Sequence, residues 1–220
     1  MLFPEGCAAC EKELVSGELL ICTDCRVNLP KSESLEEINN SLRMRFRGRV
    51  NFEYAISFFK YTKSGKVQNL LHEFKYNGVQ EIGAVISGWV ADQLIVNGYH
   101  NKFDLIIPVP LHKSRLRNRG FNQAEVFAKG ISEELHINMY PLIAERMVAT
   151  KTQTGYNVSS RWENVKDIFI ITDGEKILGK RVLIVDDIVT TGATIESLAN
   201  EIRKYKPLSI SLLTMADADH

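Results

Sequence analysis

Two adjacent carboxylates, Asp186 and Asp187, stand directly before a run of small and hydroxyl-bearing residues. A carboxylate pair can hold Mg²⁺ through water, or accept hydrogen bonds from two neighbouring sugar hydroxyls. The run offers backbone N–H groups, hydroxyls and a glycine that allows close approach, all of which suit a phosphate. Its members are Ile188, Val189, Thr190, Thr191, Gly192, Ala193 and Thr194. Together, the carboxylate pair and this run indicate a site for a ribose 5-phosphate. The alternative is an aspartate-rich strand end before a capped helix.

The flanking residues predict a strand, a turn and a helix around this motif. Residues 182–185 form a continuous apolar run, which is typical of a strand buried on both faces of a parallel sheet. After the turn, apolar residues recur at helical spacing, at Ile195, Leu198, Ala199, Ile202 and Tyr205. The turn is therefore expected at a helix N-terminus, where the helix dipole favours an anion.

A second junction of this kind carries positive charge. Residues 104–110 predict a buried strand that stops near its prolines, and an apolar pattern predicts a helix over 121–135. The segment between them contains four basic residues, Lys113, Arg115, Arg117 and Arg119. Arginine binds phosphate groups well because its donors form a fixed fork. The segment is thus a candidate site for a polyanion, with a solvated basic loop as the alternative.

The cysteines form a separate motif near the start of the chain. Cys7, Cys10, Cys22 and Cys25 are spaced C-x2-C-x11-C-x2-C, and the chain has no other cysteine. In a reducing compartment this spacing indicates a tetrahedral Zn²⁺ site. Four thiolates leave no open position for a substrate, so the zinc is expected to be structural. Reduced free thiols or a redox pair are the alternatives.

These three motifs resemble known families. The segment V-L-I-V-D-D-I-V-T-T-G-A-T resembles the phosphoribosyl pyrophosphate signature of the type I phosphoribosyltransferases. The segment I-I-P-V-P-L-H-K-S-R-L-R-N-R-G-F-N-Q-A-E, together with the cysteine pairs, resembles the ComF family of competence proteins, which are amidophosphoribosyltransferase-like. The resemblance covers nearly the whole chain, and residues 31–50 contribute least to it.

The resemblance implies a type I phosphoribosyltransferase fold, phosphoribosyl pyrophosphate as ligand and Mg²⁺ as cofactor. It makes Asp186 and Asp187 the catalytic pair and places the pyrophosphate loop at residues 110–120, with Pro110, Lys113, Arg115 and Arg119 as binding residues. It also implies a mobile hood over the reacting ribose that contains Lys151, Gln153 and Arg161, with Arg146 in the same pattern. Closure of a hood excludes water from a labile anomeric carbon. An ordinary surface connection is the alternative for that segment.

The element order predicts an α/β domain with a mainly parallel sheet flanked by helices. Residues 1–30 are assigned to the zinc knuckle, 31–50 to a linker and 51–220 to the phosphoribosyltransferase-like domain. Further strands are expected over 52–61, 138–148, 167–171 and 208–215, and further helices around 67–74 and 82–94. Four arginines alternate along the linker, at Arg43, Arg45, Arg47 and Arg49; a solvated face is favoured over an edge that meets nucleic acid.

Composition narrows the class of protein. The 27 basic and 27 acidic residues balance, which argues against a dedicated nucleic-acid binder. The first residues lack the pattern of a signal peptide, and no apolar run reaches the length of a membrane span, so a cytoplasmic protein without membrane insertion is expected.

Two functions remain open from the sequence. One is an enzyme that displaces pyrophosphate from the anomeric carbon with an unidentified acceptor. The other, implied by the ComF resemblance, is a non-catalytic module of natural transformation that handles single-stranded DNA, or works with the competence machinery, and uses the ribose-phosphate site as a sensor. A purine salvage enzyme is a weaker option, because the cysteine pairs and the R-G-F-N-Q segment argue against it.

Overall fold

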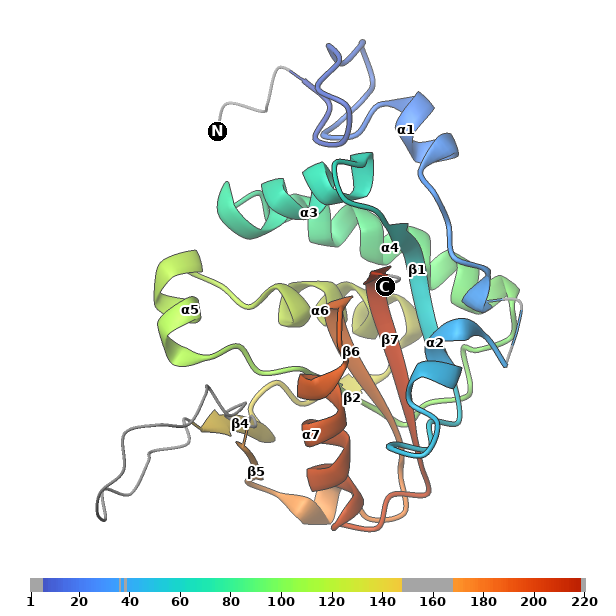
Figure 1. Cartoon of the computed structure of the whole chain (residues 1–220), viewed down its shortest axis with the longest axis vertical. Helices are drawn as coiled ribbons and strands as arrows, with labels where there is room; N and C mark the ends of the chain where they lie inside the picture. The colour runs from blue at the N-terminus through green and yellow to red at the C-terminus, as the bar shows by residue number, and fades with distance from the viewer. Residues whose placement is uncertain (1–5, 36, 38, 148–167, 219–220) are drawn as a thin grey trace, which may run out of the picture.

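A five-stranded parallel sheet forms the centre of the chain, as the computed structural model shows for residues 6–35, 37, 39–147 and 168–218. The strand order is β1-β7-β6-β2-β3, so the last strand lies between the first and β6 (Figure 1). Its strands are β1 (Ala55–Tyr61), β2 (Leu105–Pro108), β3 (Asn138–Met139), β6 (Arg181–Val189) and β7 (Ser209–Ala218). A separate antiparallel pair is formed by β4 (Ala144–Met147) and β5 (Ile168–Ile171). This is the predicted α/β class, with the arrangement of a type I phosphoribosyltransferase.

Helices cover both faces of the sheet. The helices are α1 (Thr23–Asn28), α2 (Ser41–Arg45), α3 (Lys66–Tyr76), α4 (Glu81–Val96), α5 (Lys113–Arg119), α6 (Gln123–Leu135) and α7 (Ala193–Arg203), with short 3₁₀ turns at Glu33–Leu35 and Gly174–Lys176. Helices α3, α4 and α6 pack on one face and α7 on the other (Figure 1). None of the helices in the described ranges has the length and apolar character needed to cross a bilayer.

Strand β6 contributes to a core on each side of the sheet. Leu183 and Val185 belong to the cluster under α3, α4 and α6, while Val182 and Ile184 belong to the cluster under α7. Successive strand residues point to opposite faces, so a run that is apolar throughout must be buried on both. The prediction of a doubly buried strand is confirmed.

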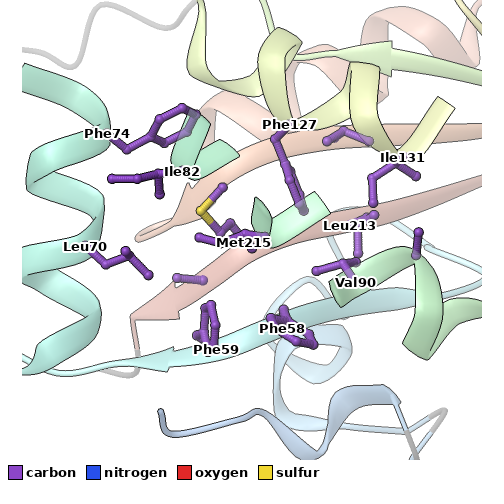
Figure 2. Close-up of a cluster of buried hydrophobic side chains, with 14 of the residues drawn as sticks. Phe58, Phe59, Leu70, Phe74, Ile82, Val90, Phe127, Ile131, Leu213 and Met215 are labelled. Atoms are coloured by element: carbon purple, nitrogen blue, oxygen red, sulfur yellow. The ribbon is translucent and has the colours of Figure 1, made fainter. Parts of the chain in front are cut away.

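The first of these clusters fixes α3 and α6 on the sheet. Figure 2 shows Phe74 of α3 and Phe127 of α6 among the side chains that surround Met215 of β7. All three are completely buried. The ends of α3 and α6 that approach the sheet's carboxyl edge are therefore held by packing in the core.

Three elements differ from the sequence expectation. The basic segment after β2 forms the short helix α5 instead of a loop, because His112 caps its first turn and Gly120 ends it in the left-handed conformation. The strand expected over 138–148 is divided into β3, in the main sheet, and β4, outside it. Strand β6 continues to Val189, so the carboxylate pair lies in the strand and not after it.

The segment 31–50 packs against the domain. Leu42, Phe46 and Val50 are buried in the cluster under α7. Arg45 pairs with Asp217 at the end of β7 at 2.6 Å, and its side chain is 19% exposed. Arg49 lies over the Phe46 ring and pairs with Glu196 of α7 at 2.9 Å. The expectation of a solvated basic face is therefore wrong for Arg45, although Arg47 is exposed.

Candidate functional site

A pocket of about 250 Å³ opens at the carboxyl ends of β2 and β6. Ligands of open α/β sheets lie at this edge, where loops from neighbouring strands meet. The pocket brings together most of the residues singled out in the sequence, namely Pro110, Arg115, Arg119, Asp186, Asp187, Ile188, Val189, Thr190, Thr191, Gly192, Ala193 and Thr194. Lys113 is exposed on α5 and is not among the lining residues. Lys151, Gln153 and Arg161 lie outside the described residues.

The turn before α7 forms one wall of the pocket and has the geometry of an anion cradle. Gly192 is the N-cap of α7 and adopts φ 78°, in the left-handed region where glycine is favoured. The first N–H groups of α7 have no partner within the helix and, with the helix dipole, favour a negative charge. Thr191 Oγ1 is 3.4 Å from the Ala193 N–H, which it accepts as a weak hydrogen bond. The wall therefore suits a phosphate.

A residue outside the motif supports this turn. A β-carbon added at Gly192 would lie 2.6 Å from the ring of Phe46, which is completely buried. Arg45 donates to the Thr190 carbonyl at 3.1 Å. The segment 41–50 thus packs against the turn and supports it. Only glycine at position 192 leaves room for the Phe46 ring.

The carboxylate pair forms the base of the pocket, and its two members have different surroundings. Asp187 Oδ2 lies 2.7 Å from the Nζ atom of Lys75, and both side chains are nearly buried. Asp186 Oδ1 accepts the Asp187 N–H at 2.9 Å. Burial, followed by the negative charge of Asp187, raises the pKa of the Asp186 carboxyl well above its ordinary value. Asp187 thus has a cationic partner, while Asp186 retains a proton more readily.

Two basic residues of the pocket, Arg115 and Arg119, come from α5. Arg115 is exposed, whereas Arg119 is partly buried and lies over the Tyr76 ring. Arg119 also donates to Gln123 Oε1 at 2.9 Å. Two guanidinium groups opposite a helix N-terminus give the pocket positive charge on two sides, which suits a ligand that carries phosphates at both ends.

Sequence reasoning missed three polar residues that line the pocket. Asn122 and Gln123 belong to the R-G-F-N-Q segment, which was used only as a family resemblance. Lys75 was missed because its helix was interpreted from its apolar face alone, and its partner Asp187 lies far along the chain. Arg146 of β4, which the family pattern includes, also lines the pocket. No local sequence signal points to Lys75.

The residues of the pocket fit Mg²⁺ only in a partly hydrated form. Asp186 and Asp187 offer the oxygen ligands that Mg²⁺ prefers. However, the described residues contain no cluster of three or more metal-ligating side chains at this pocket. Mg²⁺ usually keeps several waters and binds through one or two carboxylates plus substrate phosphates. The donor set therefore matches a cation that arrives with a phosphate ligand and contacts the carboxylates through water.

The four cysteines gather beside α3. Their Sγ atoms all lie within 4.8 Å of one another, and the Cys10 and Cys22 sulfurs are 3.7 Å apart. A tetrahedron with Zn–S bonds of about 2.3 Å has edges of roughly 3.8 Å. Burial opposes ionisation of Cys7, but backbone hydrogen bonds from Cys22, Ala9 and Cys10 outweigh it and lower the pKa of its thiol to about 7. The geometry fits one zinc ion.

The cysteine cluster is attached to the domain by apolar packing in the cluster under α3 and by further contacts. Asn69 of α3 donates to the Ala9 carbonyl at 3.2 Å, and Arg26 lies over the Trp89 ring of α4. The cluster's own segment, 6–25, is too short for an independent hydrophobic core. A metal ion would therefore stabilise both this segment and its contact with α3 and α4.

We expect one Zn²⁺ per chain in protein purified without added zinc. Elemental analysis by mass spectrometry measures the ratio, and Cys25→Ser should lower it to near zero while the sheet remains folded. Because the four clustered cysteines are the only ones in the chain, a thiol reagent should release the zinc as it modifies them. A zinc content near zero with all four thiols protected from the reagent would contradict this expectation.

Comparison with known proteins supports a family assignment. The model described as "Phosphoribosyl transferase domain" matches residues 79–220. Competence protein F of Haemophilus influenzae is 34% identical over 116 residues, which cover 52% of this chain and 51% of the relative. DNA utilization protein YhgH of Escherichia coli (strain K12) is 31% identical, with 59% and 58% covered. Competence protein ComFC of Bacillus subtilis (strain 168) is 27% identical, with 89% and 71% covered.

These matches confirm the resemblance to competence proteins. The matched segment spans about half the length of Competence protein F. Among solved structures, a purine phosphoribosyltransferase from Pyrococcus horikoshii Ot3 is 21% identical, with a TM-score of 0.40 and coverage of 60% of this chain and 70% of that one. A hypoxanthine phosphoribosyltransferase from Staphylococcus aureus is 19% identical, with a TM-score of 0.40 and 63% and 65% coverage.

Proposed function

Because the chain belongs to the phosphoribosyl transferase domain family, we propose that it binds phosphoribosyl pyrophosphate with Mg²⁺ and transfers the phosphoribosyl group to a nitrogen acceptor. One observation carries the proposal: a single pocket combines an anion cradle, a carboxylate pair and two arginines at the carboxyl ends of β2 and β6. Phosphoribosyl pyrophosphate carries a 5-phosphate, vicinal hydroxyls and a diphosphate. The cradle, the carboxylate pair and the arginines suit these three parts in turn.

Each part of the pocket has a role in the proposed reaction. The backbone and hydroxyls of the turn from Thr190 to Thr194 bind the 5-phosphate and fix the ribose. Asp186 and Asp187 accept hydrogen bonds from the ribose hydroxyls and stabilise positive charge that develops on the ring as the bond from C1 to the diphosphate oxygen breaks. Arg115 and Arg119 neutralise the diphosphate, which leaves with that bond's electron pair.

Mg²⁺, when bound, supplies further positive charge against the diphosphate and would be held at Asp186 and Asp187 through water. The acceptor's nitrogen lone pair forms the new bond to C1. The fold does not define this acceptor, because one fold hosts many activities.

Isothermal titration of the full chain with phosphoribosyl pyrophosphate, with and without Mg²⁺, tests the binding step. We expect saturable binding at one site per chain that strengthens with Mg²⁺. Pyrophosphate release is then measured with candidate nitrogen acceptors. Absence of binding in both conditions would reject the proposal, whereas binding without release would leave a sensor of the same ligand.

A second candidate function rests on a different surface. A groove of about 770 Å³ lies beside α2, and four arginines line it, namely Arg43, Arg47, Arg49 and Arg203. The names of the relatives, which refer to competence and to DNA utilization, are consistent with a role in handling DNA. We propose this groove, and not the pocket, as the place where single-stranded DNA would bind, because guanidinium groups in a groove follow a phosphate backbone.

Charge reversal at Arg47 and Arg203 distinguishes the two candidates. These residues are chosen because Arg45 and Arg49 form ion pairs that hold the segment 41–50 in place. In a fluorescence anisotropy titration across salt concentration, we expect weak binding of single-stranded DNA that falls steeply with salt. Arg47→Glu with Arg203→Glu should weaken it by roughly tenfold or more while the affinity for phosphoribosyl pyrophosphate stays unchanged.

The matched control for this experiment is Lys129→Glu on α6, where the side chain is exposed. It removes the same kind of charge elsewhere on the surface. The double variant reverses two charges and the control reverses one, so a loss in the control about half as large on a logarithmic scale would mean that only the overall charge matters. Salt-independent binding would exclude the groove as a phosphate-backbone site.

A further inference from the structure

Lys75 connects the carboxylate pair to the basic side of the pocket. We infer that Lys75 blocks the pair against free divalent cations in the absence of ligand, and that its ammonium transfers to the diphosphate when the ligand binds. The inference rests on the proposed function for the identity of the ligand. Its first half, exclusion of free cations, concerns the protein alone.

The contact between Lys75 and Asp187 is built into the fold. Lys75 is the penultimate residue of α3, whose buried face ends with the completely buried Phe74. Its Nζ atom lies 2.7 Å from Asp187 Oδ2, and the two side chains are only 15% and 13% exposed. An ion pair shielded in this way is stronger than a surface pair, because less water screens it.

This contact changes what the carboxylate pair can bind. Two adjacent carboxylates with no counter-ion would attract a divalent cation. Here the ammonium neutralises one negative charge and occupies one carboxylate oxygen. The described residues around the pair supply no third metal-ligating side chain. A free cation must therefore displace Lys75 and gains few ligands in return, whereas a cation that arrives with a diphosphate brings its own oxygen ligands.

Once displaced from Asp187, the Lys75 ammonium would lie within reach of a diphosphate bound in the pocket. Lys75 lines the main pocket and also an adjoining groove of about 470 Å³, which is lined by Tyr76, Arg115, Asn118 and Arg119 as well. Lysine has a flexible stem and no fixed donor fork, so it can turn from Asp187 toward the arginines without movement of α3. A diphosphate held by Arg115 and Arg119 would then accept a third positive charge.

Binding of Mn²⁺ alone, followed by electron paramagnetic resonance on the full chain without any phosphate ligand, tests the first half. We expect Lys75→Met to bind Mn²⁺ about tenfold or more tightly than the unaltered protein, and Lys75→Arg to remain close to it. Adding Asp187→Asn to Lys75→Met should abolish the gain. Lys129→Met, on α6, is the matched control and should change nothing, because its side chain is exposed and pairs with Glu133 at 3.9 Å.

Calorimetric titration with inorganic pyrophosphate in the absence of metal tests the second half. Lys75→Met should weaken pyrophosphate binding by about tenfold, and Lys75→Arg should preserve it because the charge is kept. Circular dichroism and thermal unfolding establish that each variant is folded, and Lys75→Gln, which also removes the charge but keeps a polar side chain, replaces Lys75→Met in both titrations if that variant unfolds.

The outcomes separate this inference from the proposed function. Equal Mn²⁺ affinity in Lys75→Met and the unaltered protein, with both folded, would overturn the inference even if phosphoribosyl pyrophosphate binds. Likewise, tight Mn²⁺ binding by the unaltered protein that Asp187→Asn removes would show that Lys75 excludes nothing. Failure of phosphoribosyl pyrophosphate to bind would reject the proposed function but would leave the Mn²⁺ result intact.

Discussion

Replacement of both Asp186 and Asp187 by asparagine is expected to weaken Mg²⁺-dependent binding of phosphoribosyl pyrophosphate by on the order of tenfold to a hundredfold, without unfolding the chain. A hydrogen bond to a charged group typically contributes about 1.5–3 kcal/mol, which corresponds to that range. Asparagine is nearly the same size as aspartate, so the packing at the base of the pocket should persist. Isothermal titration measures the affinity, and thermal unfolding establishes that the variant is folded.

The single variants should differ in effect. The pKa of Asp186 is raised by burial and by Asp187, so its carboxyl accepts a proton more readily than an ordinary one and a neutral asparagine changes it less. Asp187 forms an ion pair with Lys75, and its replacement removes a carboxylate charge that the ligand would meet once Lys75 has turned away. Asp187→Asn is therefore expected to weaken binding more than Asp186→Asn. Asp92→Asn, exposed on α4, is the matched control. Unchanged binding in the double variant would mean that the carboxylates do not contact the ligand.

Gly192→Ala should lower the free energy of unfolding by about 2–4 kcal/mol and should also disrupt phosphate binding. About 1–2 kcal/mol comes from placing a side chain in the left-handed region, since Gly192 has φ 78°. The remainder comes from crowding, because the new β-carbon would lie 2.6 Å from the buried ring of Phe46. Chemical denaturation measures the stability, and titration with phosphoribosyl pyrophosphate measures the binding.

Gly98→Ala separates these two contributions. Gly98 has φ 75°, almost the same as Gly192, but a β-carbon there would meet nothing within 4 Å. It should cost only the conformational part, about 1–2 kcal/mol. In addition, the loss caused by Gly192→Ala should be smaller in a Phe46→Leu background. Equal losses at the two glycines, with no coupling to Phe46, would show that crowding at the turn is absent.

Whether a feature of this fold could be predicted depends on how far apart along the chain the interacting residues lie. The apolar run 182–185, the helical spacing after Gly192 and the cysteine spacing are local patterns, and each predicted its element or cluster correctly. The basic segment and the carboxylate pair line one pocket, because the carboxyl ends of parallel strands share one edge of the sheet. The helical form of the basic segment was missed, because caps at His112 and Gly120 determine it.

Contacts between distant segments could not be predicted from these patterns. Lys75 lies on a helix whose sequence indicates only an apolar face, and nothing near it predicts an ion pair with Asp187. In the same way, Phe46 belongs to a segment that resembled a linker, yet its ring sets the room available at Gly192. Such contacts depend on how whole elements pack, and a single sequence has no periodic signal for them.

The packing of segment 41–50 behind the turn at Gly192 has a consequence for how this protein can be divided or recombined. The family match begins at residue 79, so Phe46, Arg45 and Lys75 all lie outside it. A fragment cut at that boundary would keep the signature motif but lose the ring that supports it and the cation beside it. In a chimera of two relatives, the residue at position 46 and the turn at 192 therefore have to come from the same parent.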